Sequence, residues 1–119
     1  MATILVADDE TPIVALLHDL LENEGHSVLV AHNGREALAL ARAAHPDLIL
    51  SDIMMPLMDG MQLVRMLREE AITREVVVIL MSAAQPPDLV SVGAAAFLAK
   101  PFDLDEVNRL IARHLATQL

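Results

Sequence analysis

Short, continuous apolar runs alternate along this chain with longer segments in which polar and apolar residues mix. The runs consist of aliphatic and β-branched residues without regular polar alternation, and they cover 3–7, 27–31, 48–51, 76–81 and 95–98. Such runs are typical of strands that are buried on both faces of a parallel sheet. Because 76–81 is the most β-branched of them, we expect it to be a central strand.

The segments between the runs place their apolar residues at helical spacing. Thr11 followed by Pro12 predicts a first helix with Thr11 as its N-cap, and Gly25 predicts where that helix ends. Asn33-Gly34 opens a second helix. His45-Pro46 closes it, because the residue before a proline avoids the helical conformation.

Three more helices are predicted in the second half of the chain. The third follows a loop at 54–60, and a brief fourth covers 88–92. Asp103 and Glu106 have the spacing of a capping box at the start of the fifth. Alternating strands and helices imply parallel strands joined by right-handed crossovers, with helices on both faces. Ligands of such sheets bind at the carboxyl ends of the strands.

Composition limits the class of protein. With 119 residues the chain has room for a single domain, taken as 1–119. Hydrophobic residues make up 55% of the sequence, but no apolar stretch approaches the roughly 18 residues that cross a bilayer. The first residues lack the basic start of a signal peptide, and there is no cysteine for disulfides or thiolate–metal sites. We therefore expect a cytoplasmic domain without membrane contact.

The formal net charge of −9 argues against nucleic-acid binding by this domain, since that requires a basic face. A strongly acidic domain instead attracts divalent cations and partners with basic groups.

Carboxylates stand where two of the predicted strands end. Asp8 and Asp9 follow the first run, with Glu10 close by, and Asp52 follows the third. Side chains at these positions converge on one edge of the sheet, where their mutual repulsion favours a hard divalent cation such as Mg²⁺. The alternative is that they are solvated loop acids, which is the common role of aspartate near turns. Asp59, next to Gly60, is interpreted as such a turn residue.

A hydroxyl and an ammonium occupy the ends of the last two strands. Ser82 follows the fourth run, and Lys100, the only lysine of the chain, follows the fifth. Pro101 fixes the backbone just beyond the lysine and suits a cis peptide bond in a tight turn. A carboxylate such as Asp52 can attack phosphorus, and a hydroxyl can donate to a phosphoryl oxygen. A lysine can pair with Asp52 or with the phosphoryl group. The simpler alternatives are a serine that bonds its own backbone and an exposed surface lysine.

Four segments, in order, resemble the receiver domain of bacterial two-component response regulators over essentially the whole chain. They are residues 4–10, 47–52, 55–60 and 93–102. The resemblance, which is to chemotaxis-type regulators, implies a flavodoxin-like, doubly wound α/β fold. Its five parallel strands have the order 2-1-3-4-5 and are joined by five helices.

The resemblance also implies a role for each matching residue. Asp52 matches the phosphoacceptor, and the cation, Mg²⁺ or alternatively Mn²⁺, is expected on Asp8, Asp9, Asp52 and the backbone carbonyl of Met54. Ser82, Phe97 and Lys100 match the residues that bind the phosphoryl group and switch. Pro56, Gly60 and Pro101 match structural positions of the family. A sensor histidine kinase or a phosphotransfer protein is the expected donor.

The segment between Ser82 and Lys100 departs from the family pattern. It is shorter by about four residues, roughly one helical turn, and Gln85-Pro86-Pro87-Asp88 replaces the usual polar helix start. We therefore expect a shortened fourth helix. The surface of the fourth helix, fifth strand and fifth helix, where we expect an output partner or self-association, would be altered as a result.

Two other functions remain as alternatives. An aspartyl-nucleophile phosphatase would typically place a second acid two residues after the nucleophile, where this chain has Met54. A degenerate receiver would act only as a protein-interaction module, without phosphorylation. The favoured hypothesis is a phosphorylation switch that is no enzyme in the usual sense, because it catalyses only its own phosphorylation and dephosphorylation.

Overall fold

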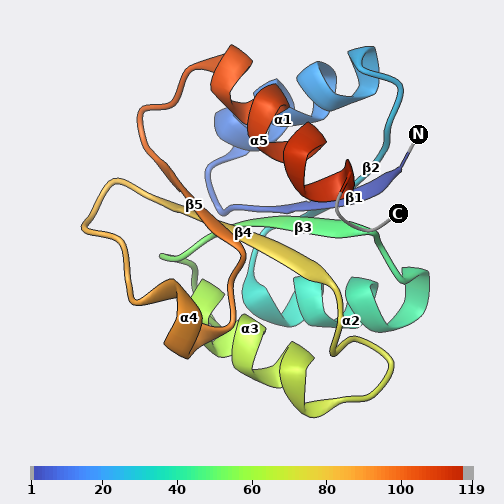
Figure 1. Cartoon of the computed structure of the whole chain (residues 1–119), viewed down its shortest axis with the longest axis vertical. Helices are drawn as coiled ribbons and strands as arrows, with labels where there is room; N and C mark the ends of the chain where they lie inside the picture. The colour runs from blue at the N-terminus through green and yellow to red at the C-terminus, as the bar shows by residue number, and fades with distance from the viewer. Residues whose placement is uncertain (1, 117–119) are drawn as a thin grey trace.

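The apolar runs form one parallel sheet with strand order β2-β1-β3-β4-β5, as predicted. The computed structural model describes residues 2–116 and places helices on both sides of this sheet (Figure 1). The strands are β1 (Thr3–Ala7), β2 (Ser27–Ala31), β3 (Leu48–Asp52), β4 (Val77–Ser82) and β5 (Ala96–Ala99). The helices are α1 (Thr11–Asn23), α2 (Gly34–Ala44), α3 (Gly60–Glu69), α4 (Leu89–Val92) and α5 (Leu104–Ala116). Residues 1 and 117–119 of the predicted domain lie outside the described part.

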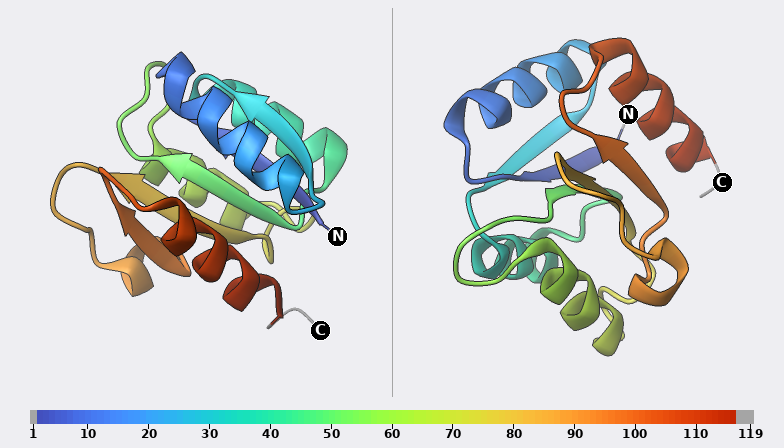
Figure 2. Two further views of the ribbon diagram at one scale, coloured as in Figure 1. Left: turned by 90° about the horizontal axis from the view of Figure 1, so that it is seen from above. Right: turned by 90° about the vertical axis from the view of Figure 1, so that its left-hand side faces the viewer.

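Each strand contributes side chains to two separate apolar cores, one on each face of the sheet. In β1, Leu5 packs into the core beneath α2 and α3, whereas Ile4 and Val6 pack into the core beneath α1 and α5. Figures 1 and 2 show α1 and α5 on one face and α2, α3 and α4 on the other. Because side chains alternate between the faces, a strand covered on both sides must be apolar throughout. This is the physical reason for the continuous runs.

The predicted N-terminal caps of α1 and α5 differ from those in the structure. Glu10, not Thr11, is the N-cap of α1, and its side chain makes no capping bond, because its carboxylate contacts Lys100. At α5, Asp103 accepts a hydrogen bond from the Asp105 amide at 2.8 Å. A capping box would join Asp103 to the third helical residue, Glu106, but Asp105 is the second. Within residues 2–116 Glu106 makes no bond with Asp103 in either direction, so the predicted capping box is absent and Asp103 caps α5 through the Asp105 amide alone.

The helices α2 and α3 begin with side-chain N-cap hydrogen bonds. Asn33 caps α2 by accepting from the Glu36 amide at 2.8 Å, as its position predicts. Asp59 and Gln62 form a full capping box at α3, which the sequence interpretation treated only as a turn. These caps fix the starts of the two helices that lie next to the loop after β3.

The fourth helix is short, as predicted. It spans four residues, begins at the Asp88 cap and ends at Gly93, whose φ of 93° lies in the left-handed region. Among residues 2–116, no helix is long and apolar enough to cross a membrane.

Arg68 on α3 joins the short α4 to the rest of the fold. Its guanidinium donates to the Gly93 carbonyl at 2.8 and 3.2 Å and to the Arg74 carbonyl at 2.8 Å. Burial lowers the pKa of Arg68 from its usual value. The side chain therefore serves as a half-buried bracket between the segments that precede β4 and β5.

Replacing this bracket gives a prediction for stability. Arg68→Lys keeps the charge but cannot reach both carbonyls with a planar fork, so we expect the free energy of unfolding to fall by about 1–2 kcal/mol. Arg65→Lys, at an exposed position of the same helix, should change it by less than about 0.5 kcal/mol. Urea unfolding measures both. Equal losses in the two variants would contradict the bracket.

Candidate functional site

All five residues singled out at strand ends lie at the carboxyl edge of the sheet. Asp8 and Asp9 directly follow β1, Asp52 ends β3, Ser82 ends β4 and Lys100 follows β5. The parallel register brings these ends together, since Ala7 is paired with Ser51, Asp52 with Met81, and Ser82 with Ala99. The predicted convergence is confirmed.

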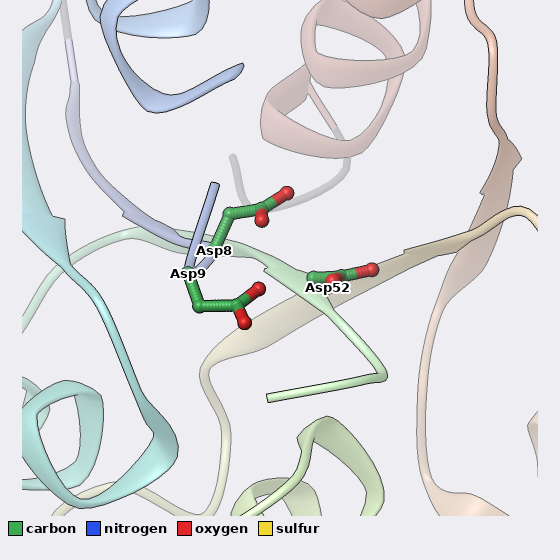
Figure 3. A group of neighbouring side chains, drawn as sticks. All are labelled: Asp8, Asp9 and Asp52. Carbon is green, nitrogen blue, oxygen red and sulfur yellow. The ribbon is translucent and has the colours of Figure 1, made fainter. Parts of the chain in front are cut away.

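The three aspartates form one cluster (Figure 3). Asp8 is fully buried, Asp52 is 5% exposed and Asp9 is exposed. Each offers a carboxylate oxygen that lies within 4.8 Å of those of the others. A magnesium ion holds its oxygen ligands at about 2.0–2.1 Å, so small side-chain movements bring these oxygens into one coordination shell. The donor set, all oxygen and strongly negative, suits Mg²⁺ and Mn²⁺.

Lys100 supplies the positive charge of the cluster. Its Nζ lies 2.9 Å from Asp8 Oδ2, 3.2 Å from Glu10 Oε2 and 3.4 Å from Asp52 Oδ1. Its side chain is only 14% exposed, which excludes the surface-lysine alternative. Burial opposes the charge, but the hydrogen bond to Asp8 and the nearby carboxylates outweigh it and raise the pKa of Lys100 to about 12. The ammonium is therefore charged at neutral pH.

Two details of the lysine contacts differ from the sequence interpretation. The predicted partner was Asp52 or a phosphoryl group, but the shortest contact is to Asp8. Glu10 was placed near the cluster and proves to be an ion-pair partner of Lys100. The Lys100–Pro101 peptide bond is cis, as suggested by the proline at this position.

Ser82 combines the functional and the simpler interpretation. Its Oγ accepts a hydrogen bond from the Ala84 amide at 3.0 Å, so it does bond its own backbone. The hydroxyl hydrogen remains available to a ligand. Ser82 lines an open cavity of about 440 Å³ together with Asp9, Asp52, Met54 and Lys100.

Of the remaining predicted residues, Met54 lines this cavity, whereas Phe97, Gly60 and Pro56 do not. Met54 follows Asp52 closely in the chain, and its side chain is 70% exposed. Phe97 is partly buried and packs against the core under α2 and α3. Gly60 lies against the backbone of β3, where an added Cβ would come within 2.4 Å of the Asp52 carbonyl oxygen. Pro56 is exposed in the loop between Met54 and Gly60.

Asp52 carries a shifted pKa. Burial, and then the charge of Asp8, raise the pKa of its carboxyl from 3.8 to about 6, although Lys100 opposes the shift. In the absence of a cation Asp52 therefore keeps its proton up to a higher pH than an ordinary aspartic acid, because a second buried carboxylate charge is costly. A bound divalent cation would lower the pKa of Asp52 again.

The raised pKa predicts how the stability of the cation-free protein depends on pH. Folding favours protonated Asp52, so its contribution is fully present below about pH 4 and is lost as the pH rises through about 6. The loss amounts to at most about 3 kcal/mol. Urea unfolding in EDTA, at several pH values, should show that Asp52→Asn gains stability over the unchanged protein as the pH rises. A gain that is independent of pH would contradict the shift.

Comparison with known proteins supports the same site. The sequence model of the family described as "Response regulator receiver domain" matches residues 4–112. Protein PilH of Pseudomonas aeruginosa is 39% identical, covering 98% of this chain and 99% of that protein. Sporulation initiation phosphotransferase F of Bacillus subtilis is 34% identical, covering 94% of this chain and 92% of that protein.

Other relatives are longer. Regulatory protein AtoC of Escherichia coli is 37% identical over 97% of this chain, which spans only 25% of AtoC. Similarly, the chain spans 45% of the regulatory protein PhoP of Bacillus subtilis. The similarity to these proteins therefore concerns only one part of each.

Solved structures agree in fold. The Francisella response regulator 1452 receiver domain gives a TM-score of 0.91 at 31% identity, with full coverage of both chains. Vibrio cholerae chemotaxis protein CheY4 gives 0.89 at 32%, covering 95% of this chain and 98% of that chain. The receiver domain of sensor histidine kinase PA1611 from Pseudomonas aeruginosa, solved with magnesium in its active site cleft, gives 0.89 at 26%, covering 97% and 98%. The chain thus belongs to the family of response regulator receiver domains, the phosphorylation switches of two-component signal transduction.

Proposed function

We propose that this domain accepts a phosphoryl group on Asp52 from a phosphohistidine of a sensor histidine kinase or a phosphotransfer protein. One observation carries the proposal: Asp52 lies at the end of a rigid, buried strand, with Oδ1 3.4 Å from the ammonium of Lys100 and its carboxylate beside those of Asp8 and Asp9. The nucleophile Asp52, the positive charge of Lys100 and the carboxylate of Asp9, which would help to hold the cation, thus line one open cavity.

The reaction uses few protein groups. A carboxylate oxygen of Asp52 forms a new bond to phosphorus as the phosphorus–nitrogen bond of the donor breaks, and the imidazole leaves with the electron pair. A divalent cation on Asp8, Asp9, Asp52 and the Met54 carbonyl would offset charge on the phosphoryl oxygens. Lys100, now shared by Asp8 and Glu10, would pair with the same group, because its Nζ already lies within reach of Asp52.

The switch would then depend on Ser82 and Phe97. The hydroxyl of Ser82 is free to donate to a phosphoryl oxygen. Movement of Ser82 would alter β4 and its neighbour β5, which carries the partly buried Phe97. We propose that the state of the site is reported on the surface of α4, β5 and α5, to an output partner or to a second copy. The shortness of α4 would alter this surface.

A direct experiment tests the acceptor. Incubated with Mg²⁺ and a small acyl phosphate, the domain should form a base-labile phosphoprotein, and Asp52→Asn should reduce the yield by at least about 100-fold. Asp47→Asn is a matched control, since Asp47 precedes the same strand at the opposite edge of the sheet and its contact to the Thr3 amide can be kept by an amide oxygen. A labelled Asp52→Asn protein, or an unlabelled Asp47→Asn protein, would refute Asp52 as acceptor.

Beryllofluoride provides a second measurement that requires no covalent chemistry. With Mg²⁺ it should shift the NMR signals of Ser82, Ala84 and Lys100 in the unchanged protein and leave those of Asp52→Asn in place. A protein that responds in neither experiment would be a degenerate receiver. Release of phosphate from a phosphomonoester over many turnovers would instead favour the phosphatase alternative.

A further inference from the structure

A basic and apolar patch lies on the side of the molecule formed by α2, α3 and the loop after β3. A small cavity of about 200 Å³ is lined there by Arg35, Leu57, Met58, Gln62, Arg65 and Met66. We call these residues the α2–α3 patch. It is separate from the aspartate cluster, with which it shares no lining residue.

The patch carries two unpaired positive charges, although the chain as a whole is acidic. The net charge is −9, with eight basic side chains in all. Arg35 and Arg65 are both exposed, and within residues 2–116 neither guanidinium has an ion pair or a hydrogen bond. By contrast, Arg42 is paired with Glu70, and Arg68 is bound to backbone carbonyls. Arg35 and Arg65 therefore border one small cavity whose lining is partly apolar. Among the described residues the other unpaired arginines, Arg109 and Arg113, lie on α5 at the opposite face of the sheet.

The apolar part of the patch is exposed at a defined place. Leu57 is 70% exposed, although a large aliphatic side chain gains by burial. Its φ is 69°, a region that costs a leucine roughly 1–2 kcal/mol. The Met58 amide donates to the Pro56 carbonyl at 2.8 Å across it, which gives the three residues the form of a γ-turn.

The conformation of Leu57 is fixed by its surroundings. The Met58 carbonyl accepts from the Gly34 amide at 3.0 Å, which ties the tip of the loop to the first residue of α2. Because no Cβ intervenes at Gly34, these backbones are in direct contact. The patch is therefore preformed, and a ligand would pay little to order it.

We propose that the α2–α3 patch binds an acidic segment of a partner protein that carries an aliphatic anchor residue. Charge complementarity selects the partner: carboxylates pair with Arg35 and Arg65, while the aliphatic anchor covers Leu57 and enters the cavity beside Met58 and Met66. Methionine side chains suit such a site because they adapt to the shape of the anchor. At physiological ionic strength the Debye length is about 8 Å, so the local guanidinium charges outweigh the overall negative charge of the domain.

The probe for this site is a fluorescein-labelled amphipathic helical peptide composed of glutamate and leucine, with serine-for-leucine and lysine-for-glutamate versions as comparison peptides. We expect the glutamate–leucine peptide to bind with a Kd below about 1 mM by fluorescence anisotropy. The double variant Arg35→Glu, Arg65→Glu should weaken binding by at least about tenfold. Leu57→Asn, which suits the left-handed backbone, should weaken it by at least about fivefold.

The control variant is Arg109→Glu, Arg113→Glu. These arginines are exposed on α5, also without a partner among the described residues, and the variant has the same change in net charge. It should alter the Kd by less than about twofold. Circular dichroism and urea unfolding establish that all variants are folded. The measurement is repeated with Asp52→Asn, whose binding should be unchanged, so this proposal stands or fails independently of phosphorylation.

Four results would overturn the proposal. They are no binding of the glutamate–leucine peptide up to about 1 mM, equal binding of the serine comparison peptide, an equal loss of binding in the α5 control, and NMR shifts that lie away from Leu57 and Met58. If sedimentation instead showed that the patch joins two copies of this chain, the occupant would be the chain itself and the assignment of a partner segment would be wrong.

Discussion

Lys100→Met should disable the site in two measurable ways. Asp8 is fully buried and is 2.9 Å from the Lys100 ammonium, so the variant leaves a buried carboxylate without its cation. Removing one partner of a buried ion pair costs about 3–5 kcal/mol. Because Glu10 and Asp9 are exposed and water reaches the cavity, we expect a loss of about 2–4 kcal/mol in urea unfolding in the presence of EDTA.

Mg²⁺ should restore much of this loss. Without the ammonium, the net charge of the site is one unit more negative, so the divalent cation binds more strongly. It therefore stabilises the variant more than the unchanged protein. Phosphoryl transfer from an acyl phosphate should nevertheless fall by about 100-fold, since a charge-stabilising donor is missing. Arg109→Met, which removes an exposed charge on α5, is the control. Equal losses of stability in both variants would mean that the buried pair contributes nothing.

Gly60→Ala should cause the other large effect. An added Cβ would lie 2.4 Å from the Asp52 carbonyl oxygen and 2.9 Å from the Ile53 Cα. These are backbone atoms of the strand end and cannot rotate away, and the Gly60 amide also donates to the Ile53 carbonyl at 2.8 Å. We expect the free energy of unfolding to fall by at least about 3 kcal/mol. Phosphorylation of Asp52 should decline as well, because the clash displaces its backbone.

Gly25→Ala is the matched control for this substitution. Gly25 has a φ of 94° and no atom within 4 Å of the added Cβ, so only backbone strain arises. That strain amounts to roughly 1–2 kcal/mol. Urea unfolding compares the two variants directly. If Gly60→Ala cost no more than Gly25→Ala, the close approach to Asp52 would have no energetic weight.

The site could be predicted from sequence because parallel strands end at a common edge. Asp8, Asp52, Ser82 and Lys100 each follow an apolar run, and the register of the sheet alone brings them together. No side-chain detail was needed for that step. The alternation of strands and helices likewise explains why both helical layers could be expected. The strand order, by contrast, was implied by the resemblance to receiver domains.

The finer contacts could not be predicted, because they depend on which of several polar partners a side chain reaches. Lys100 is closest to Asp8, although Asp52 was the expected partner, since three carboxylates lie within its reach. Glu10 contacts Lys100 and so leaves α1 without a side-chain cap. The capping box of Asp59 and Gln62 was visible in the sequence as an acid followed three residues later by glutamine, but it was interpreted only as a turn.

The left-handed conformation of Leu57 had no signal in the sequence, because leucine rarely adopts it. It arises from contacts far apart in the chain. The Gly34 amide holds the Met58 carbonyl, while Gly60 lies against Asp52, and both ends of the intervening loop are thereby fixed.

This double attachment determines how the loop can vary. Surface loops usually tolerate inserted or deleted residues, since their ends are free to adjust. Here Met58 is held by Gly34, and Gly60 lies against Asp52 and Ile53, so one residue more or less between Met58 and Gly60 would break one of the two contacts. The spacing of these two residues is consequently as fixed as the register of a strand, whereas a residue added before Pro56 would leave both contacts in place.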